Sequence, residues 1–131
     1  MIVSQGKENK LNSIIRASRI ISRMNQASTE ARKSNTLYYQ MMADYYTRLL
    51  EASKEGEFIA AHTVFFPAEI LYAMDIVPMH TETTTWMIAL FTGQSAGMLS
   101  AEAELGLASE ICTPHRGLAG AFALGVLPRP S

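Results

Sequence analysis

The fold of this chain is decided by residues 58–79, FIAAHTVFFPAEILYAMDIVPM. Residues 58–66 form a short apolar run without helical period, which is typical of a buried strand. Pro67 stands where a helix can begin, and Glu69 would lie in its first turn, near the positive end of the helix dipole. Residues 76–79 are a second short apolar segment. The stretch therefore predicts a strand–helix–strand unit with a helix of about two turns, and hence a parallel α/β sheet.

Upstream of this unit, residues 1–56 predict two amphipathic helices. Apolar side chains recur at three- and four-residue steps from Leu11 to Met24, and arginines occupy the other side. Residues 25–28 are a polar break, after which the same period continues until Gly56. The pattern favours a helical hairpin. The tyrosines of the second helix are interpreted as packing residues rather than as a ligand-stacking box; they are Tyr38, Tyr39, Tyr45 and Tyr46.

Downstream, residues 80–85 are interpreted as a threonine-rich loop, and residues 86–91 are compatible with helix or strand. Residues 100–107 and 116–127 predict two further helices. The second is dense in Gly and Ala, which permits close helix approach; its small residues are Gly117, Ala119, Gly120, Ala121 and Ala123. The sequence then ends in a turn-like tail, residues 127–131, where a doubly wound sheet should continue with another strand.

The expected fold class is therefore α/β and helix-rich. A helical hairpin, residues 1–56, leads into an incomplete doubly wound parallel-sheet domain, residues 57–131, which carries the single cysteine. The chain has 131 residues, of which 48% are hydrophobic, so it has the size of one domain and enough apolar side chains to bury a core.

Composition also limits the location of the protein. One cysteine among eight methionines, without a secretory signal, indicates a reducing cytoplasm and excludes an intramolecular disulfide. The uncharged stretch from Thr83 to Ala101 has the length of a membrane span, but its Thr, Ser and Gln side chains disfavour insertion. We therefore expect a cytoplasmic protein without a membrane partner.

The charge of the chain is divided unevenly. Residues 1–54 carry nine Lys and Arg and four Asp and Glu, whereas residues 55–131 carry two and eight. This asymmetry marks either a basic arm for an acidic partner or for nucleotide phosphates, or two surfaces of one fold that face each other. A nucleic-acid partner is not expected, because the arginines and lysines are accompanied by no stacking pattern and no fold signature.

The only cysteine lies in residues 109–116, SEICTPHR. A thiolate at Cys112 would gain from Arg116 one turn further on and from a helix amino terminus at Thr113, which suits a metal ligand. The alternative is a small buried hydrophobic side chain, the ordinary role of a free cysteine. His115 is interpreted as a surface or capping residue.

Glu69 is the other candidate site residue. A carboxylate after a strand, at the start of a helix, lies at the carboxyl edge of a parallel sheet, where ligands bind in such folds. The alternative is a charge that only stabilises the helix start. His62 and His80 would lie at the same edge, but a His/Glu metal site has no support from ligand spacing. The glycine-rich nucleotide loops and the Gly-x-Ser-x-Gly elbow of other enzyme classes are absent.

Two motifs in order carry a resemblance to a known family: residues 66–79, FPAEILYAMDIVPM, followed by residues 110–116, EICTPHR. Together they resemble the amino-terminal domain of 2-hydroxyacyl-CoA dehydratase subunits, which are related to benzoyl-CoA reductase subunits. The similarity covers about residues 57–131, and Cys112 matches the first of three cysteines that hold a 4Fe–4S cluster in that family. The other two cysteines are absent from this sequence.

The resemblance implies a subunit of a heterodimer with a related dehydratase subunit, activated by an ATP-dependent iron–sulfur protein. Its reaction would be the radical elimination of water from a 2-hydroxyacyl-CoA thioester. From its position at the sheet edge, and not from the resemblance, Glu69 is the candidate catalytic residue. A cluster needs about four ligands, so its ligand set is incomplete in this chain and the isolated chain is expected to be inactive. The alternatives are a non-catalytic interaction or assembly module and a fragment of a benzoyl-CoA reductase-type subunit.

Overall fold

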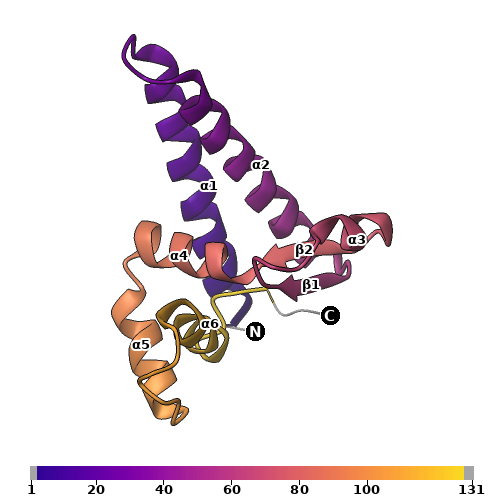
Figure 1. Ribbon diagram of the computed structural model, residues 1–131, viewed down its shortest axis with the longest axis vertical. Helices are drawn as coiled ribbons and strands as arrows, with labels where there is room; N and C mark the ends of the chain where they lie inside the picture. Colours follow the sequence, from indigo (N-terminus) through magenta and orange to yellow (C-terminus); the bar gives the residue numbers. More distant parts are fainter. Residues whose placement is uncertain (1–2, 129–131) are drawn as a thin grey trace.

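The amino-terminal half is a long helical hairpin that projects from the rest of the molecule. The computed structural model describes residues 3–128, and it places α1 at Val3–Ala27 and α2 at Lys33–Glu55 (Figure 1). Gly56 ends α2 with a φ of 73°, a left-handed conformation that glycine adopts without strain. The hairpin prediction is confirmed. The predicted units of residues 1–56 and 57–131 include residues 1–2 and the end of the tail, residues 129–131, which lie outside the described residues.

A strand–helix–strand unit follows the hairpin. It consists of β1 at Ile59–His62, α3 at Ala68–Ala73 and β2 at Val77–His80. The two strands are parallel, with Ile59 opposite Val77 and His62 opposite His80. The structure is therefore helix-rich with a small two-stranded parallel sheet in the described chain, as the sequence predicted.

The first predicted strand was too long. Residues 63–66 leave the sheet as a turn, and Phe65 has 94% of its surface exposed. The apolar side chains of residues 64–66 are therefore not buried within the described chain. Pro67 is also not the first helical residue but the residue before it, with a φ of −72° and a ψ of 97°.

The threonine-rich segment is helical, so its interpretation as a loop was wrong. Helix α4 runs through Thr81–Thr92 and includes residues 86–91, which the sequence left undecided. The His80 side chain caps it by accepting a hydrogen bond from the Thr83 backbone N–H at 3.3 Å. The buried side chains recur at helical spacing, but most of them are threonines; they are Thr81, Thr84, Thr85 and Ile88.

The last two helices pack closely against each other. Helix α5 runs through Ser95–Glu104 and α6 through Thr113–Ala123, so both predicted helices exist with earlier boundaries. A Cβ atom at Gly120 would lie 1.9 Å from the Met98 backbone oxygen, and one at Gly117 would lie 3.0 Å from the Thr85 side chain. The expectation that small residues permit close helix approach is confirmed.

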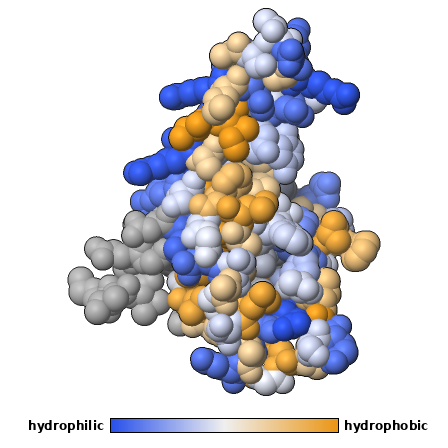
Figure 2. Space-filling view, turned by 90° about the vertical axis from the view of Figure 1, so that its left-hand side faces the viewer, coloured by the Kyte–Doolittle hydropathy of each residue, from blue (hydrophilic) through white to orange (hydrophobic). Residues whose placement is uncertain are grey.

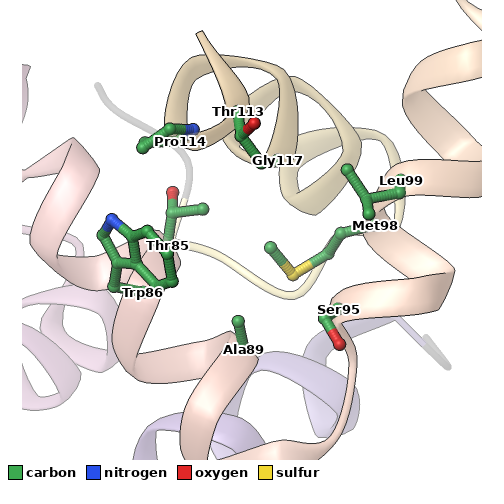
Figure 3. Close-up of a pocket in the computed structure, with 9 residues that line it drawn as sticks. All are labelled: Thr85, Trp86, Ala89, Ser95, Met98, Leu99, Thr113, Pro114 and Gly117. Atoms are coloured by element: carbon green, nitrogen blue, oxygen red, sulfur yellow. The ribbon is translucent and has the colours of Figure 1, made fainter.

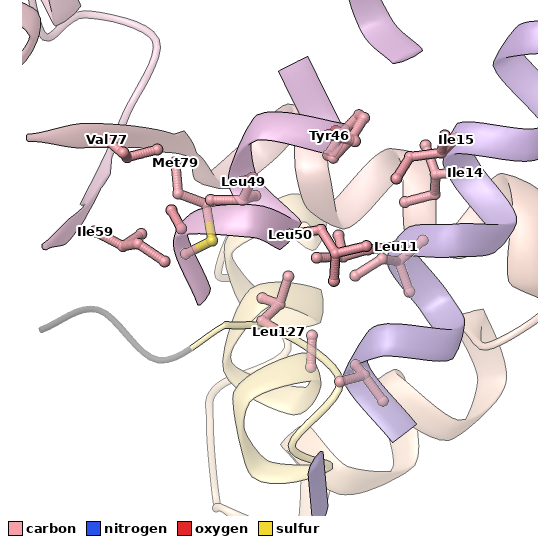
Figure 4. Packing of buried hydrophobic residues seen from close by; sticks show 14 of the residues in the cluster. Leu11, Ile14, Ile15, Tyr46, Leu49, Leu50, Ile59, Val77, Met79 and Leu127 are labelled. Atoms are coloured by element: carbon pink, nitrogen blue, oxygen red, sulfur yellow. The ribbon is translucent and has the colours of Figure 1, made fainter. Parts of the chain in front are cut away.

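One hydrophobic core joins the base of the hairpin to the sheet and to the end of the described chain. Figure 4 shows Leu11 and Ile14 of α1 close to Leu50 of α2, and Leu127 nearby. On the sheet side, Met79 packs in the same cluster and is fully buried. None of the helices in residues 3–128 has the combination of length and hydropathy that crossing a membrane requires.

Candidate functional site

Cys112 lies at the start of α6, with its side chain exposed. Its carbonyl oxygen accepts hydrogen bonds from the backbone N–H groups of His115 and Arg116, both at 3.0 Å, and so begins the helix. The thiol is free. The alternative interpretation of Cys112 as a small buried hydrophobic residue is therefore wrong, and the thiol stands at the positive end of a helix dipole as expected.

Arg116 binds a carboxylate and a carbonyl oxygen, and not the Cys112 thiol that the sequence suggested as its partner. Its guanidinium Nε lies 2.5 Å from Oε2 of Glu102, its Nη2 contacts Oε1 of the same carboxylate, and its Nη1 donates to the Ser109 carbonyl oxygen at 2.8 Å. The hydrogen bond from Arg116 holds the pKa of Glu102 below its usual range. Arg116 thus fastens the segment before Cys112 to α5, and Glu102 neutralises its charge.

The carboxyl ends of the two strands bring two histidines together, as the sequence predicted. The rings of His62 and His80 lie 5.2 Å apart, centroid to centroid, in an edge-to-face arrangement. The Thr81 hydroxyl donates to the His62 carbonyl oxygen at 3.0 Å and ties the start of α4 to the end of β1. This is the edge of a parallel sheet at which α/β proteins bind their ligands.

Glu82 is the residue of this edge that sequence reasoning missed. Its Oε2 lies 3.4 Å from Nδ1 of His80, and its Oε1 lies 3.4 Å from Nε2 of His115. The contact with His115 links the amino-terminal turn of α6 to the sheet edge, so the site combines β1, β2, α4 and α6. The missed signal was an acidic residue two positions after a strand-ending histidine, in a segment interpreted as a loop.

Several groups keep Glu82 ionised. Burial acts against the charged carboxylate, but hydrogen bonds from its own backbone, from the Thr81 hydroxyl and from the Val64 backbone outweigh it, with a smaller contribution from His80. The pKa of Glu82 is therefore lowered. A carboxylate with a lowered pKa is a weak base. It is therefore better suited to bind and orient hydrogen-bond donors than to abstract a proton.

Glu69 lies away from these contacts. It is exposed in the first turn of α3, and among the described residues it has no ion-pair partner. The segment between β1 and α3 approaches Glu82 through Val64, not through Glu69. Its surroundings favour the helix-start interpretation, and a catalytic role for Glu69 stays a prediction.

A small apolar cavity adjoins the residues that follow Cys112. It has a volume of about 90 Å³ and lies between α4, α5 and α6. Figure 3 shows Trp86 on one side of it, Met98 and Leu99 on the other, and Thr113 and Pro114 above. Its lining can receive a small apolar group and offers almost no polar partner.

A complete iron–sulfur cluster does not fit this chain alone. A 4Fe–4S cluster takes about four ligands, and the sequence holds a single cysteine. In residues 3–128 no group of three or more His, Cys, Asp or Glu side chains is placed to bind a metal ion, and this includes the histidines around Glu82. Cys112 can supply one thiolate.

Comparisons with protein-family models, with curated proteins and with solved structures find no match to this chain.

Proposed function

We propose that the chain is part of a 2-hydroxyacyl-CoA dehydratase-type subunit, in which Cys112 supplies one thiolate to a 4Fe–4S cluster. The other cluster ligands would come from residues beyond these 131 or from a partner. The observation that carries this proposal is the exposed thiol at the amino terminus of α6, which the Glu82–His115 contact links to the sheet edge. The resemblance in residues 57–131 supplies the chemical class: loss of water from a 2-hydroxyacyl-CoA thioester.

The partners follow from the same resemblance. They are a related dehydratase subunit, which would form a heterodimer with this chain, and an ATP-dependent iron–sulfur activator. The protein's own residues would have simpler tasks. Arg116 and Glu102 fix the segment that carries Cys112, and the histidines around Glu82 offer hydrogen bonds at the sheet edge.

Iron and acid-labile sulfide analysis of the native protein, isolated anaerobically with its associated subunits, tests the proposal. We expect iron and sulfide in the wild-type complex and their loss in Cys112→Ser. A matched control is His115→Gln, which alters a neighbouring side chain without removing a thiol. Absence of iron from the wild-type complex would overturn the cluster assignment. Activity of the loaded complex on a 2-hydroxyacyl-CoA or on benzoyl-CoA then separates dehydratase from aromatic-ring reductase.

The exposed apolar residues around α3 favour a second candidate, a non-catalytic interaction module. Phe65 and Met74 expose 94% and 64% of their surfaces, and neither contributes to the core. In this case the wild-type complex would hold no iron, and Cys112→Ser would bind the related subunit as the wild type does. The same preparation therefore distinguishes the two candidates.

A further inference from the structure

The side of α1 that faces away from α2 carries basic and apolar residues together. Four residues of α1 follow one another at steps of four, three and one, and therefore share one helix face: Arg16, Ile20, Arg23 and Met24. All four are exposed, Ile20 to 57% and Met24 to 66%. We call these four residues the α1 surface. Figure 2, which views the molecule from this side, shows hydrophilic arms beside apolar atoms along the hairpin.

The two arginines of the α1 surface have no acidic partner among the described residues. Within residues 3–128, neither Arg16 nor Arg23 forms an ion pair with a described acid, and the neighbouring Arg19 donates to the Thr47 hydroxyl at 3.3 Å. At the base of the hairpin, Arg48 pairs with Glu57. The charges of Arg16 and Arg23 are therefore not compensated by a described acid.

A surface of complementary character surrounds α3. Ile70, Tyr72 and Met74 are 51%, 63% and 64% exposed, and the acidic Glu69 and Asp75 of the same short segment are exposed as well. We call these five residues the α3 surface. In Figure 1, α3 lies on the right of the molecule, whereas α1 lies on the left of α2. Because the α1 surface faces away from α2, one molecule cannot bring its own two surfaces together.

We propose that the α1 surface of one copy binds the α3 surface of a second copy. Arg16 and Arg23 would meet Glu69 and Asp75, while Ile20 and Met24 would cover Ile70 and Met74. A second copy is the occupant because this chain supplies both partners of the complementary pair, whereas two α1 surfaces would repel each other. Since the two surfaces lie on opposite sides, the contact is head-to-tail and leaves one surface free at each end of the oligomer.

The size of the contact sets its strength. Each side offers little more than one helix face, well below the area of a standard stable interface, so we expect a dissociation constant of roughly 10–100 µM. Exposed charges are screened by salt, and the association should therefore weaken as ionic strength rises.

Two variants of the full chain, each with one surface altered, test the proposal by sedimentation velocity. R16E/R23E reverses the charge of the α1 surface. E69Q/D75N removes the charge of the α3 surface without making it complementary to the altered α1 surface, with Asn at position 75 because Asp75 has a φ of 58° and Asn tolerates the left-handed conformation. The wild type should form a concentration-dependent series of oligomers. Each variant alone should associate at least tenfold more weakly, and their mixture should give a 1:1 dimer that grows no further.

The controls change the same charges elsewhere. R32E/K33E lies at the turn of the hairpin, and E104Q/E110Q lies in α5 and the segment after it; both should associate as the wild type does. Circular dichroism verifies that every variant is folded. A monomeric wild type at several times the expected dissociation constant, a closed dimer, or a mixture that stays monomeric would overturn the proposal. Cys112 lies in neither surface, so Cys112→Ser should associate normally whether or not the protein binds iron.

Discussion

At the scale of single residues, Arg116 has the widest influence on the candidate site. Its guanidinium binds a carboxylate on α5 and a carbonyl oxygen before α6, and so it determines where Cys112 can lie. Glu102 is completely buried, so its negative charge depends on Arg116 for compensation. The sequence showed both residues but not their pairing, because they are fourteen positions apart on different helices and Cys112 was the nearer partner for Arg116.

The first prediction concerns this ion pair. Glu102→Gln should lower the melting temperature at pH 7 by roughly 5–10 °C, because it leaves the Arg116 charge without its partner. Glu104→Gln on the same helix is the matched control and should change the melting temperature little, since Glu104 is exposed.

The pH dependence of the same pair identifies its electrostatic origin. The pKa of Glu102 is lowered below its ordinary value of 4.5 by Arg116, so its contribution to stability is present above pH 4.5 and is lost as the pH falls through the folded-state pKa. Thermal unfolding between pH 3 and pH 7 should therefore show the wild type converging on Glu102→Gln in acid. A difference that stays constant with pH would contradict the assignment.

At the scale of elements, the sequence predicted those with clear apolar periodicity and failed where polar residues carry the pattern. The hairpin and the strand–helix–strand unit were found because isoleucine, leucine and methionine recur at the right steps. Helix α4 was missed because threonines fill its buried face. The Thr84 hydroxyl accepts a hydrogen bond from the Tyr46 hydroxyl at 3.4 Å. The Thr85 hydroxyl donates to the Thr81 carbonyl oxygen at 2.8 Å. Hydropathy cannot reveal a face that is buried through hydrogen bonds.

The same reason explains which parts of the site were predicted. His62 and His80 were placed at the sheet edge because strand ends follow from the apolar runs. Glu82 and His115 were not placed there, because their contact depends on the position of α6 against α4, which no local pattern determines.

The second prediction tests the packing of α5 against α6. Gly120→Ala should destabilise the protein by about 2 kcal/mol or more, because its Cβ would lie 1.9 Å from the Met98 carbonyl oxygen and the helices would have to separate. Gly97→Ala is the matched control. Its Cβ would meet side-chain atoms at 3.7 and 3.8 Å, an ordinary contact, and Ala favours the helix by up to about 1 kcal/mol.

Urea denaturation of the two alanine variants and the wild type provides the measurement. Opposite signs for the two substitutions are expected, with unchanged slopes if the denatured states are alike. Equal effects of both substitutions would show that the close approach at Gly120 is not required.

At the scale of the whole molecule, two neighbouring tyrosines attach the hairpin to the α/β segment. The Tyr45 hydroxyl accepts the His80 backbone N–H at 2.8 Å and donates to the Pro78 carbonyl oxygen at 3.1 Å. Tyr46 is fully buried and reaches Thr84 of α4. Their interpretation as packing residues is confirmed for these two, and their hydroxyls bind protein groups.

The third prediction follows from the burial of Tyr46. Burial raises its pKa well above the ordinary value of 10.0, because the phenolate would lose its hydration inside the core. The neutral phenol is the form that the fold requires, so its contribution to stability is complete below pH 10 and is lost as the pH rises further. The unfolded state releases this proton above pH 10 while the folded state keeps it, so alkaline unfolding should be coupled to loss of the Tyr46 proton.

Tyr46→Phe separates this effect from packing. At pH 7 the variant should lose no more than about 1 kcal/mol, because the hydrogen bond to Thr84 is long and the ring is kept. Above pH 10 it should become more stable than the wild type, since phenylalanine has no proton to lose. Tyr38→Phe, at a half-exposed tyrosine of the same helix, is the control for removal of a hydroxyl. Unfolding in urea at pH 7 and at pH 11 measures both differences, and stability curves that do not cross would show that burial of the Tyr46 hydroxyl does not weaken the fold at high pH.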